Sequence, residues 1–195
     1  MTSDMHLTWD EILPVVSAHH ELLGGEEVSD FCSLLMLADR ILFAGEAEHT
    51  APARLLTACL TELGFAAHIA DCMTISEVTP DDTLVVLDVT GSDALWRLVE
   101  PALKVRPILL AVTAGTPFSP LAKQADATVT LPIWSPPSLR DQHMYVTGLR
   151  LLCFLIVDAI RLNLLQRTRI DWTELTRSTN EAKSRRQVPA GRPLG

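Results

Sequence analysis

The stretch Thr83-Leu84-Val85-Val86-Leu87 is a short apolar run that follows the turn residues Pro80-Asp81-Asp82. Its apolar residues are consecutive rather than alternating, which is typical of a parallel strand that is covered on both faces. Pro and Asp favour the preceding turn because Pro fixes its own φ and Asp accepts local backbone hydrogen bonds. The sequence therefore predicts a buried parallel strand at 83–87.

Similar runs on either side predict four further strands, at Arg40–Ala44, Ala66–Ala70, Ile108–Val112 and Ala127–Leu131. Helical patterns separate these runs, at Pro52–Leu63, at Ala94–Leu103 and after the helix start Ser119-Pro120. Alternation of strand and helix from 40 to 131 is typical of a doubly wound α/β fold. We therefore expect a five-stranded parallel sheet with helices on both faces, because the crossovers are right-handed.

Helices are also expected at both ends of this core. The capping box Thr8-Trp9-Asp10-Glu11 predicts a first helix near Thr8, and a second covers Glu26–Ala38 with Leu37 among its inward residues. The closing helix at Met144–Gln166 is apolar on most of its surface, so we expect it to be buried and to form a subunit interface. An amphipathic helix is expected at Asp171–Lys183.

These elements predict one domain over residues 1–187. Its sheet core lies at about 40–131, its helical N-terminus at 8–38 and its C-terminal helices at 144–183, and residues 188–195 are expected to form a flexible tail. The helix after the first strand has a set of expected inward residues, which are Leu55, Leu56, Cys59, Leu60 and Leu63.

The composition excludes several classes of protein. The net charge is −8 over 195 residues, and an acidic body argues against nucleic-acid binding, which requires clustered positive charge. No apolar run is long enough for a membrane span, and the N-terminus does not resemble a signal peptide, so we expect a cytoplasmic protein. From Arg161 onward the charge is basic; this end is either solvated or contacts an anionic partner.

The four cysteines are scattered along the chain. No two of them form a C-x-x-C pair, and most lie in apolar helical contexts; they are Cys32, Cys59, Cys72 and Cys153. They are expected to be structural thiols rather than disulfides or metal ligands. We expect no metal site and no cofactor.

The carboxyl ends of the predicted strands are the expected ligand-binding edge, since parallel sheets of this kind bind ligands there. The expected ligand-binding residues at this edge are Gly45, Glu46, Thr50, Asp88, Thr90, Gly91, Ser92, Asp93 and Thr113.

Hydroxyl and backbone N–H groups at 90–92 suit a phosphate before a helix start. The carboxylates of Glu46, Glu48 and Asp88 oppose a bound phosphate, because a negative charge about 6 Å from the phosphate costs roughly 3 kcal/mol of binding free energy at an effective dielectric near 20. Asp93 is either a further opposing carboxylate or a helix N-cap.

His49 is the candidate acid/base residue. Its ordinary pKa suits proton transfer between adjacent carbons, and Glu48 or Glu46 can orient the ring. The alternative is a solvent-exposed histidine in the first turn of a helix. His143, in the loop predicted before the closing helix, is a second candidate.

Several segments of this chain, taken in their order along the sequence, resemble segments of one protein family. Ala38–Gly45, Leu60–Phe65, Leu155–Ile160 and the S-P-L-A-x-x-A-D stretch Ser119–Asp126 are similar to segments of sugar isomerase (SIS) domains, and most of all to 6-phospho-3-hexuloisomerases. The resemblance covers about Ile12 to Lys183. It implies a flavodoxin-like, SIS-type sheet, a small-molecule sugar or sugar-phosphate ligand, and a homodimer or homotetramer.

The loops depart from the family pattern. The family's first loop reads A-G-x-G-R-S-G, and Glu48 and His49 stand where that pattern has Arg and Ser. The family's catalytic Glu aligns with Arg150 or Leu149, and its C-terminal His falls near Ser178. The resemblance therefore implies a carbohydrate-derivative-binding SIS protein that is divergent and need not be catalytic. The alternatives are an active aldose–ketose sugar-phosphate isomerase, in which His49 and Glu48 are catalytic, and a protein for an amine-bearing sugar.

Overall fold

The structure is a computed structural model that describes Ser17 and residues 25–45, 50–88, 93–114, 120–131 and 139–168. Within these ranges, nothing is described of the side chains at 50, 72, 114 and 139–150. The helices predicted near Thr8 and at Asp171–Lys183 lie outside the described residues.

The sheet has five strands, all parallel, in the order β2-β1-β3-β4-β5. The strands are β1 (Arg40–Gly45), β2 (Ala67–Ile69), β3 (Asp82–Asp88), β4 (Ile108–Ala114) and β5 (Ala127–Leu131). This arrangement confirms the predicted doubly wound fold. Strand β3 lies in the middle and is buried along its whole length, which explains why its sequence is apolar without alternation.

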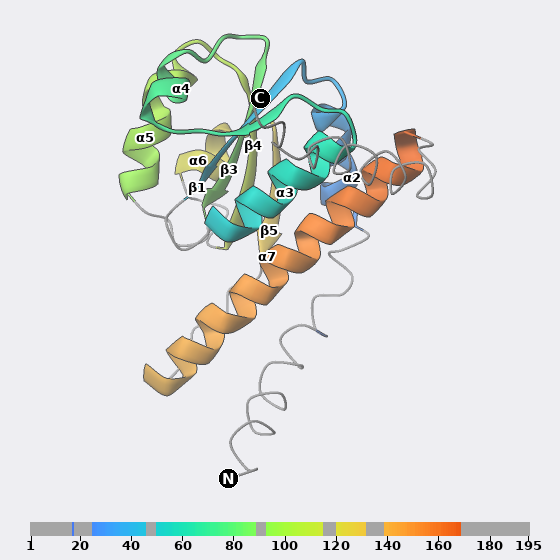
Figure 1. Cartoon of the computed structure of the whole chain (residues 1–195). Helices are drawn as coiled ribbons and strands as arrows, with labels where there is room; N and C mark the ends of the chain where they lie inside the picture. Colours follow the sequence, from blue (N-terminus) through green and yellow to red (C-terminus); the bar gives the residue numbers. More distant parts are fainter. Residues whose placement is uncertain are drawn as a thin grey trace, which may run out of the picture.

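Helices cover both faces of the sheet (Figure 1). One face carries α2 (Glu26–Leu35), α3 (Thr50–Glu62) and the long α7 (Leu139–Thr168). The other carries α4 (Cys72–Ser76), α5 (Asp93–Leu103) and α6 (Pro120–Gln124). Helix α7 runs diagonally across α2 and α3, and its first half extends beyond the sheet (Figure 1).

Strands β1, β3 and β4 each contribute to two apolar cores, because successive side chains point to opposite faces. In β3, Val85 and Leu87 pack with the α2–α3–α7 side, whereas Leu84 and Val86 pack with the α4–α5–α6 side. Burial of both faces fixes the register, since a slip of one residue would exchange the two sets.

A partly buried ion pair joins β1 and β3 at the amino ends of the strands. Nε and Nη2 of Arg40 donate to the two carboxylate oxygens of Asp82 at 2.7 and 2.6 Å. The backbone N–H and the hydroxyl of Thr79 donate to the same carboxylate, at 2.7 and 2.9 Å. Hydrogen bonds from Arg40 above all, and from Thr79, lower the pKa of Asp82 to about 2. Asp82 was expected in the turn; it is instead the first residue of β3, opposite Arg40.

Several predicted helix details were wrong. Helix α2 ends at Leu35, and the chain turns toward β1, so Leu37 is 71% exposed rather than inward. Leu55 is 39% exposed because the buried stripe of α3 is centred on Leu56, and adjacent helix positions are about 100° apart. The short helix α4 was not predicted, although Asp71 and Thr74 form a capping box at its start.

The closing helix is longer and less evenly buried than predicted. Because α7 begins at Leu139, His143 lies within a helix and not in a loop. Between 151 and 168, residues such as Ile156 and Ile160 form one buried stripe, whereas Phe154 and Leu162 are exposed on the outer side. In the described part of the chain, no helix is long and apolar enough to cross a membrane.

The thiols that are described are buried and free, as predicted for Cys32, Cys59 and Cys153. Burial raises the pKa of Cys32 to about 12 and that of Cys153 to about 11. Such thiols are protonated at neutral pH and unreactive. The side chain of Cys72 lies outside the described set.

Candidate functional site

The strand order changes direction between β1 and β3. From β1 the chain crosses through α3 to β2, on one side; from β3 it crosses through α5 to β4, on the other. Helices α3 and α5 also cover opposite faces of the sheet. The connections therefore diverge beyond the carboxyl ends of β1 and β3, which is where doubly wound sheets form a ligand crevice.

Three of the predicted site residues come together at this switch point. Gly45 ends β1 and pairs with Leu87, and the next residue of β3, Asp88, pairs with Thr113 of β4. Asp88 is 2% exposed and Thr113 is 1% exposed. By strand alternation both side chains belong to the α5 side of the sheet, like Val86. A buried carboxylate and a buried hydroxyl thus stand next to each other at the carboxyl ends of β3 and β4.

Two helices begin at this edge. Thr50 is the first residue of α3, and Asp93 is the first residue of α5. Each helix directs the positive end of its dipole toward the carboxyl ends of the strands. The first turn of α3 contains no acidic residue, whereas that of α5 contains the exposed Asp93. Of these two first turns, only that of α5 therefore carries an acidic residue.

The remaining predicted site residues lie outside the described residues. These are Glu46, Glu48 and His49 in the β1–α3 connection, and Thr90, Gly91 and Ser92 in the β3–α5 connection. Both connections leave strands that meet at the switch point, but the structure assigns no position to these side chains. Among the described residues, no cluster of three or more potential metal ligands occurs.

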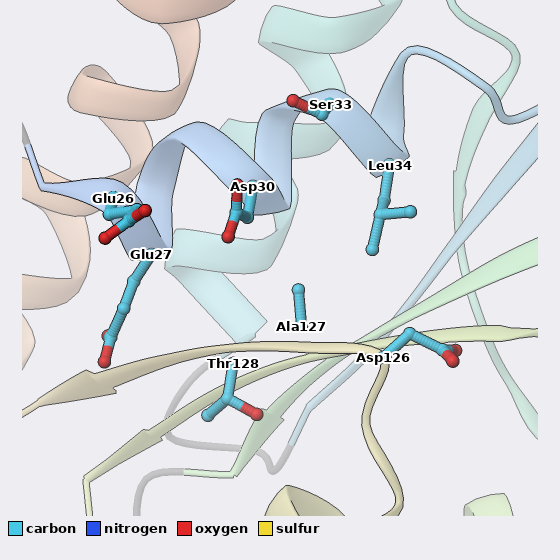
Figure 2. A pocket seen from close by; sticks show the side chains of 8 residues that line it. All are labelled: Glu26, Glu27, Asp30, Ser33, Leu34, Asp126, Ala127 and Thr128. Atoms are coloured by element: carbon cyan, nitrogen blue, oxygen red, sulfur yellow. The ribbon is translucent and has the colours of Figure 1, made fainter.

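A cavity that sequence reasoning missed lies along the edge strand β5. It is bounded by α2 and by the start of β5, has a volume of about 470 Å³ and is lined by several carboxylates (Figure 2). The sequence signals were the acidic start of α2 and Asp126 in the S-P-L-A-x-x-A-D stretch, whose carboxylate accepts from the Leu109 N–H at 2.8 Å.

The fold is shared with solved structures of low sequence identity. A protein of E. coli CFT073, solved in complex with a sugar phosphate, superposes with a TM-score of 0.72 at 17% identity, over 92% of this chain and 99% of that one. The Vibrio vulnificus NanR protein, complexed with ManNAc-6P, gives a TM-score of 0.72 at 15% identity, over 92% and 68%. The chain has the sugar isomerase (SIS) domain fold.

A third SIS-fold structure extends this comparison. It is a hypothetical protein of Methanococcus jannaschii whose structure infers a function of 3-hexulose-6-phosphate isomerase; its TM-score is 0.69 at 15% identity, over 89% of this chain and 96% of that one. No protein-family model and no curated protein matches the sequence. The SIS fold is thus carried by the order and packing of the elements rather than by detectable sequence identity.

Proposed function

We propose that the β1/β3 switch point of this SIS domain binds a sugar phosphate or a similar carbohydrate derivative. The observation that carries the proposal is the meeting of Gly45, Asp88 and Thr113 at a switch point between the N-termini of two helices. Two structures of the same fold, from E. coli CFT073 and Vibrio vulnificus, hold sugar phosphates. Helix N-termini supply the N–H donors and the positive dipole end that a phosphate group requires.

The two sides of the switch point suit different parts of such a ligand. The first turn of α3 has no acid, so the phosphate is assigned to that side. This assignment requires the Glu46 and Glu48 carboxylates, which precede α3, to point away from the phosphate. The α5 side has the Asp88 carboxylate and the Thr113 hydroxyl, which can accept hydrogen bonds from sugar hydroxyls. A phosphate on the α5 side would instead face Asp88, and a buried like charge would oppose it strongly.

Binding ranks ahead of catalysis in this proposal. By the resemblance, the catalytic Glu of these isomerases aligns with Arg150 or Leu149, and their catalytic His falls near Ser178. Isomerisation of an aldose to a ketose requires a base that moves a proton between adjacent carbons. In this chain the base would be His49, oriented by Glu48, and only an activity assay separates the two functions.

A thermal-shift panel tests the binding proposal. Fructose 6-phosphate, arabinose 5-phosphate and ManNAc-6P would be compared with unphosphorylated fructose, inorganic phosphate and an amine-bearing sugar, each at millimolar concentration. A ligand at 100 times its Kd stabilises the fold by about 2.7 kcal/mol, which is roughly 5–10 °C for a chain of this size. Absence of a shift with every phosphorylated sugar, in a folded protein, would contradict the proposal.

Two isosteric variants provide a matched control. Thr113→Val removes a hydroxyl from the ligand edge, whereas Thr83→Val removes one from the opposite end of the sheet. We expect Thr113→Val to reduce the ligand-induced shift and Thr83→Val to preserve it. Equal shifts in both variants would exclude the α5 side from the binding site.

A coupled assay for hexose phosphate interconversion tests catalysis separately. Turnover in the wild-type chain that is lost in His49→Ala, with the thermal shift retained, would establish the isomerase alternative. A thermal shift without turnover would leave a binding protein.

A further inference from the structure

The groove between α2 and the edge strand β5 is strongly acidic (Figure 2). Its described lining consists of Glu26, Glu27, Asp30, Ser33 and Leu34 from α2, with Asp126, Ala127 and Thr128 at the start of β5. Four of these eight residues are carboxylates and none is basic. A volume of about 470 Å³ can hold several side chains of a bound segment.

Two of the four carboxylates accept hydrogen bonds from the backbone, and the other two are exposed. Glu27 accepts from the backbone N–H of Thr130 at 2.9 Å, and Asp126 accepts from that of Leu109 at 2.8 Å. Glu26 and Asp30 are exposed, and within the described part of the chain neither has an ion-pair partner. The groove thus carries two negative charges beyond the two carboxylates that accept backbone hydrogen bonds.

The groove also exposes the backbone of a sheet edge. Because the N–H of Thr130 reaches Glu27, it faces away from β4. Backbone groups two residues apart on a parallel strand face the same side, so the N–H and C=O of Thr128 also point away from β4. Thr128 lines the groove, and among the described strands none pairs with β5 on that side. Edge groups of this kind pair with an extended segment that lies alongside them.

The chain leaves α7 beside this groove. Arg167 donates to the hydroxyls of Ser33 and Ser29 at 2.7 Å each, which fixes the end of α7 against α2. Ser33 is itself a lining residue. The segment that follows, Arg169–Gly195, has 27 residues with six Lys or Arg and three Asp or Glu, and its basic residues concentrate at Lys183-Ser184-Arg185-Arg186. A segment of this length reaches up to about 90 Å when extended, so it easily spans the groove.

We propose that the basic C-terminal segment, centred on Lys183–Arg186, docks in the α2–β5 groove of its own chain. Three features favour this segment as the occupant of the groove. Its charge is opposite to that of the groove, the chain leaves α7 beside the groove, and the sheet edge at Thr128 can pair with an extended segment. Two exposed ion pairs of ordinary strength correspond to roughly a fivefold change in the docking equilibrium, and salt screens them.

Limited trypsin digestion of the full chain tests the docking. Cleavage after Lys183, Arg185 and Arg186 would be followed by mass spectrometry at low salt in three proteins. These are the wild type, the groove variant Glu26→Lys/Asp30→Lys, and the control Glu62→Lys/Glu100→Lys, which reverses two exposed acids on α3 and α5. We expect cleavage roughly fivefold faster in the groove variant, wild-type rates in the control, and acceleration of the wild type by high salt. Equal rates in all three proteins would overturn the proposal.

Two further measurements keep the result unambiguous. Protection in the wild type should not change on hundredfold dilution; protection that is lost on dilution would place the segment on a second copy and overturn docking within one chain. If the double groove variant does not fold, Asp30→Asn is the milder replacement, with an expected acceleration of roughly twofold. The sugar-dependent thermal shift reports on the β1/β3 switch point and does not require the C-terminal segment, so failure of this test leaves the proposed function untouched.

Discussion

Replacement of Asp82 by asparagine tests how the strand ends are held in register. The carboxylate of Asp82 accepts two hydrogen bonds from Arg40 and two from Thr79, and only 5% of its side chain is exposed. A carboxyl pKa lowered from 3.8 to about 2 is equivalent to about 2.5 kcal/mol in favour of the ionised, folded form. Because the Arg40 side chain is 35% exposed, water screens the pair, and we expect Asp82→Asn to cost about 1.5 kcal/mol.

The loss should depend on pH in a defined direction. The pKa of Asp82 is lower in the folded chain than in the unfolded chain, so its stabilisation is complete above about pH 5 and is lost as pH falls through about 2. The difference in unfolding free energy between wild type and Asp82→Asn should therefore be constant from pH 7 to about 5 and should shrink below that.

Urea unfolding followed by circular dichroism measures this difference, with the exposed neighbour Asp81 as the control site. Asp81→Asn should change stability by less than about 0.5 kcal/mol. A double-mutant cycle with Arg40→Gln should show a coupling of about 1 kcal/mol. A cost of Asp82→Asn below about 0.5 kcal/mol at pH 7, or a cost that stays the same down to about pH 3, would show that the Arg40–Asp82 pair does not stabilise the strand ends.

Two further substitutions should move stability in opposite directions. Thr83→Val should stabilise the chain by about 1 kcal/mol in the same urea assay, because the buried Thr83 hydroxyl has no hydrogen-bond partner among the described residues and valine has nearly the same shape. A loss of stability would show that the hydroxyl does have a hydrogen-bond partner. Gly64→Ala should cost about 1 kcal/mol in thermal unfolding, because Gly64 follows α3 with φ +91°, a conformation that is unfavourable for alanine. An added Cβ meets open space, so the cost comes from the backbone alone. An unchanged Tm would mean that the turn can change its conformation without loss of stability.

Most of the sheet was predictable because its signal is local. The runs around Leu42, Val85 and Leu110 are apolar on both sides of the strand, and only a parallel sheet with two covered faces buries such runs. Helix ends were less predictable. Leu37 and Leu55 have the right residue type for the core, but the exact end of α2 and the rotation of α3 against the sheet left them exposed.

The candidate site was predicted only in part. Gly45, Asp88 and Thr113 were expected at the carboxyl ends of neighbouring strands and do lie there, and their role in ligand binding stays a prediction. Glu46, Glu48, His49, Thr90, Gly91 and Ser92 stay predictions. The acidic groove was not expected, because Glu27 and Thr130 are 103 positions apart in the chain and meet only after folding.

By itself, the sequence determined which segments become buried strands, and hence the doubly wound class, because hydrophobic burial follows from residue type within a few neighbouring positions. The tertiary structure decided the strand order β2-β1-β3-β4-β5, and with it the place of the switch point. It also decided that Arg40 meets Asp82 and that α2 lies along the edge of β5. These pairings join residues distant in sequence, and their energies depend on geometry that no local pattern encodes.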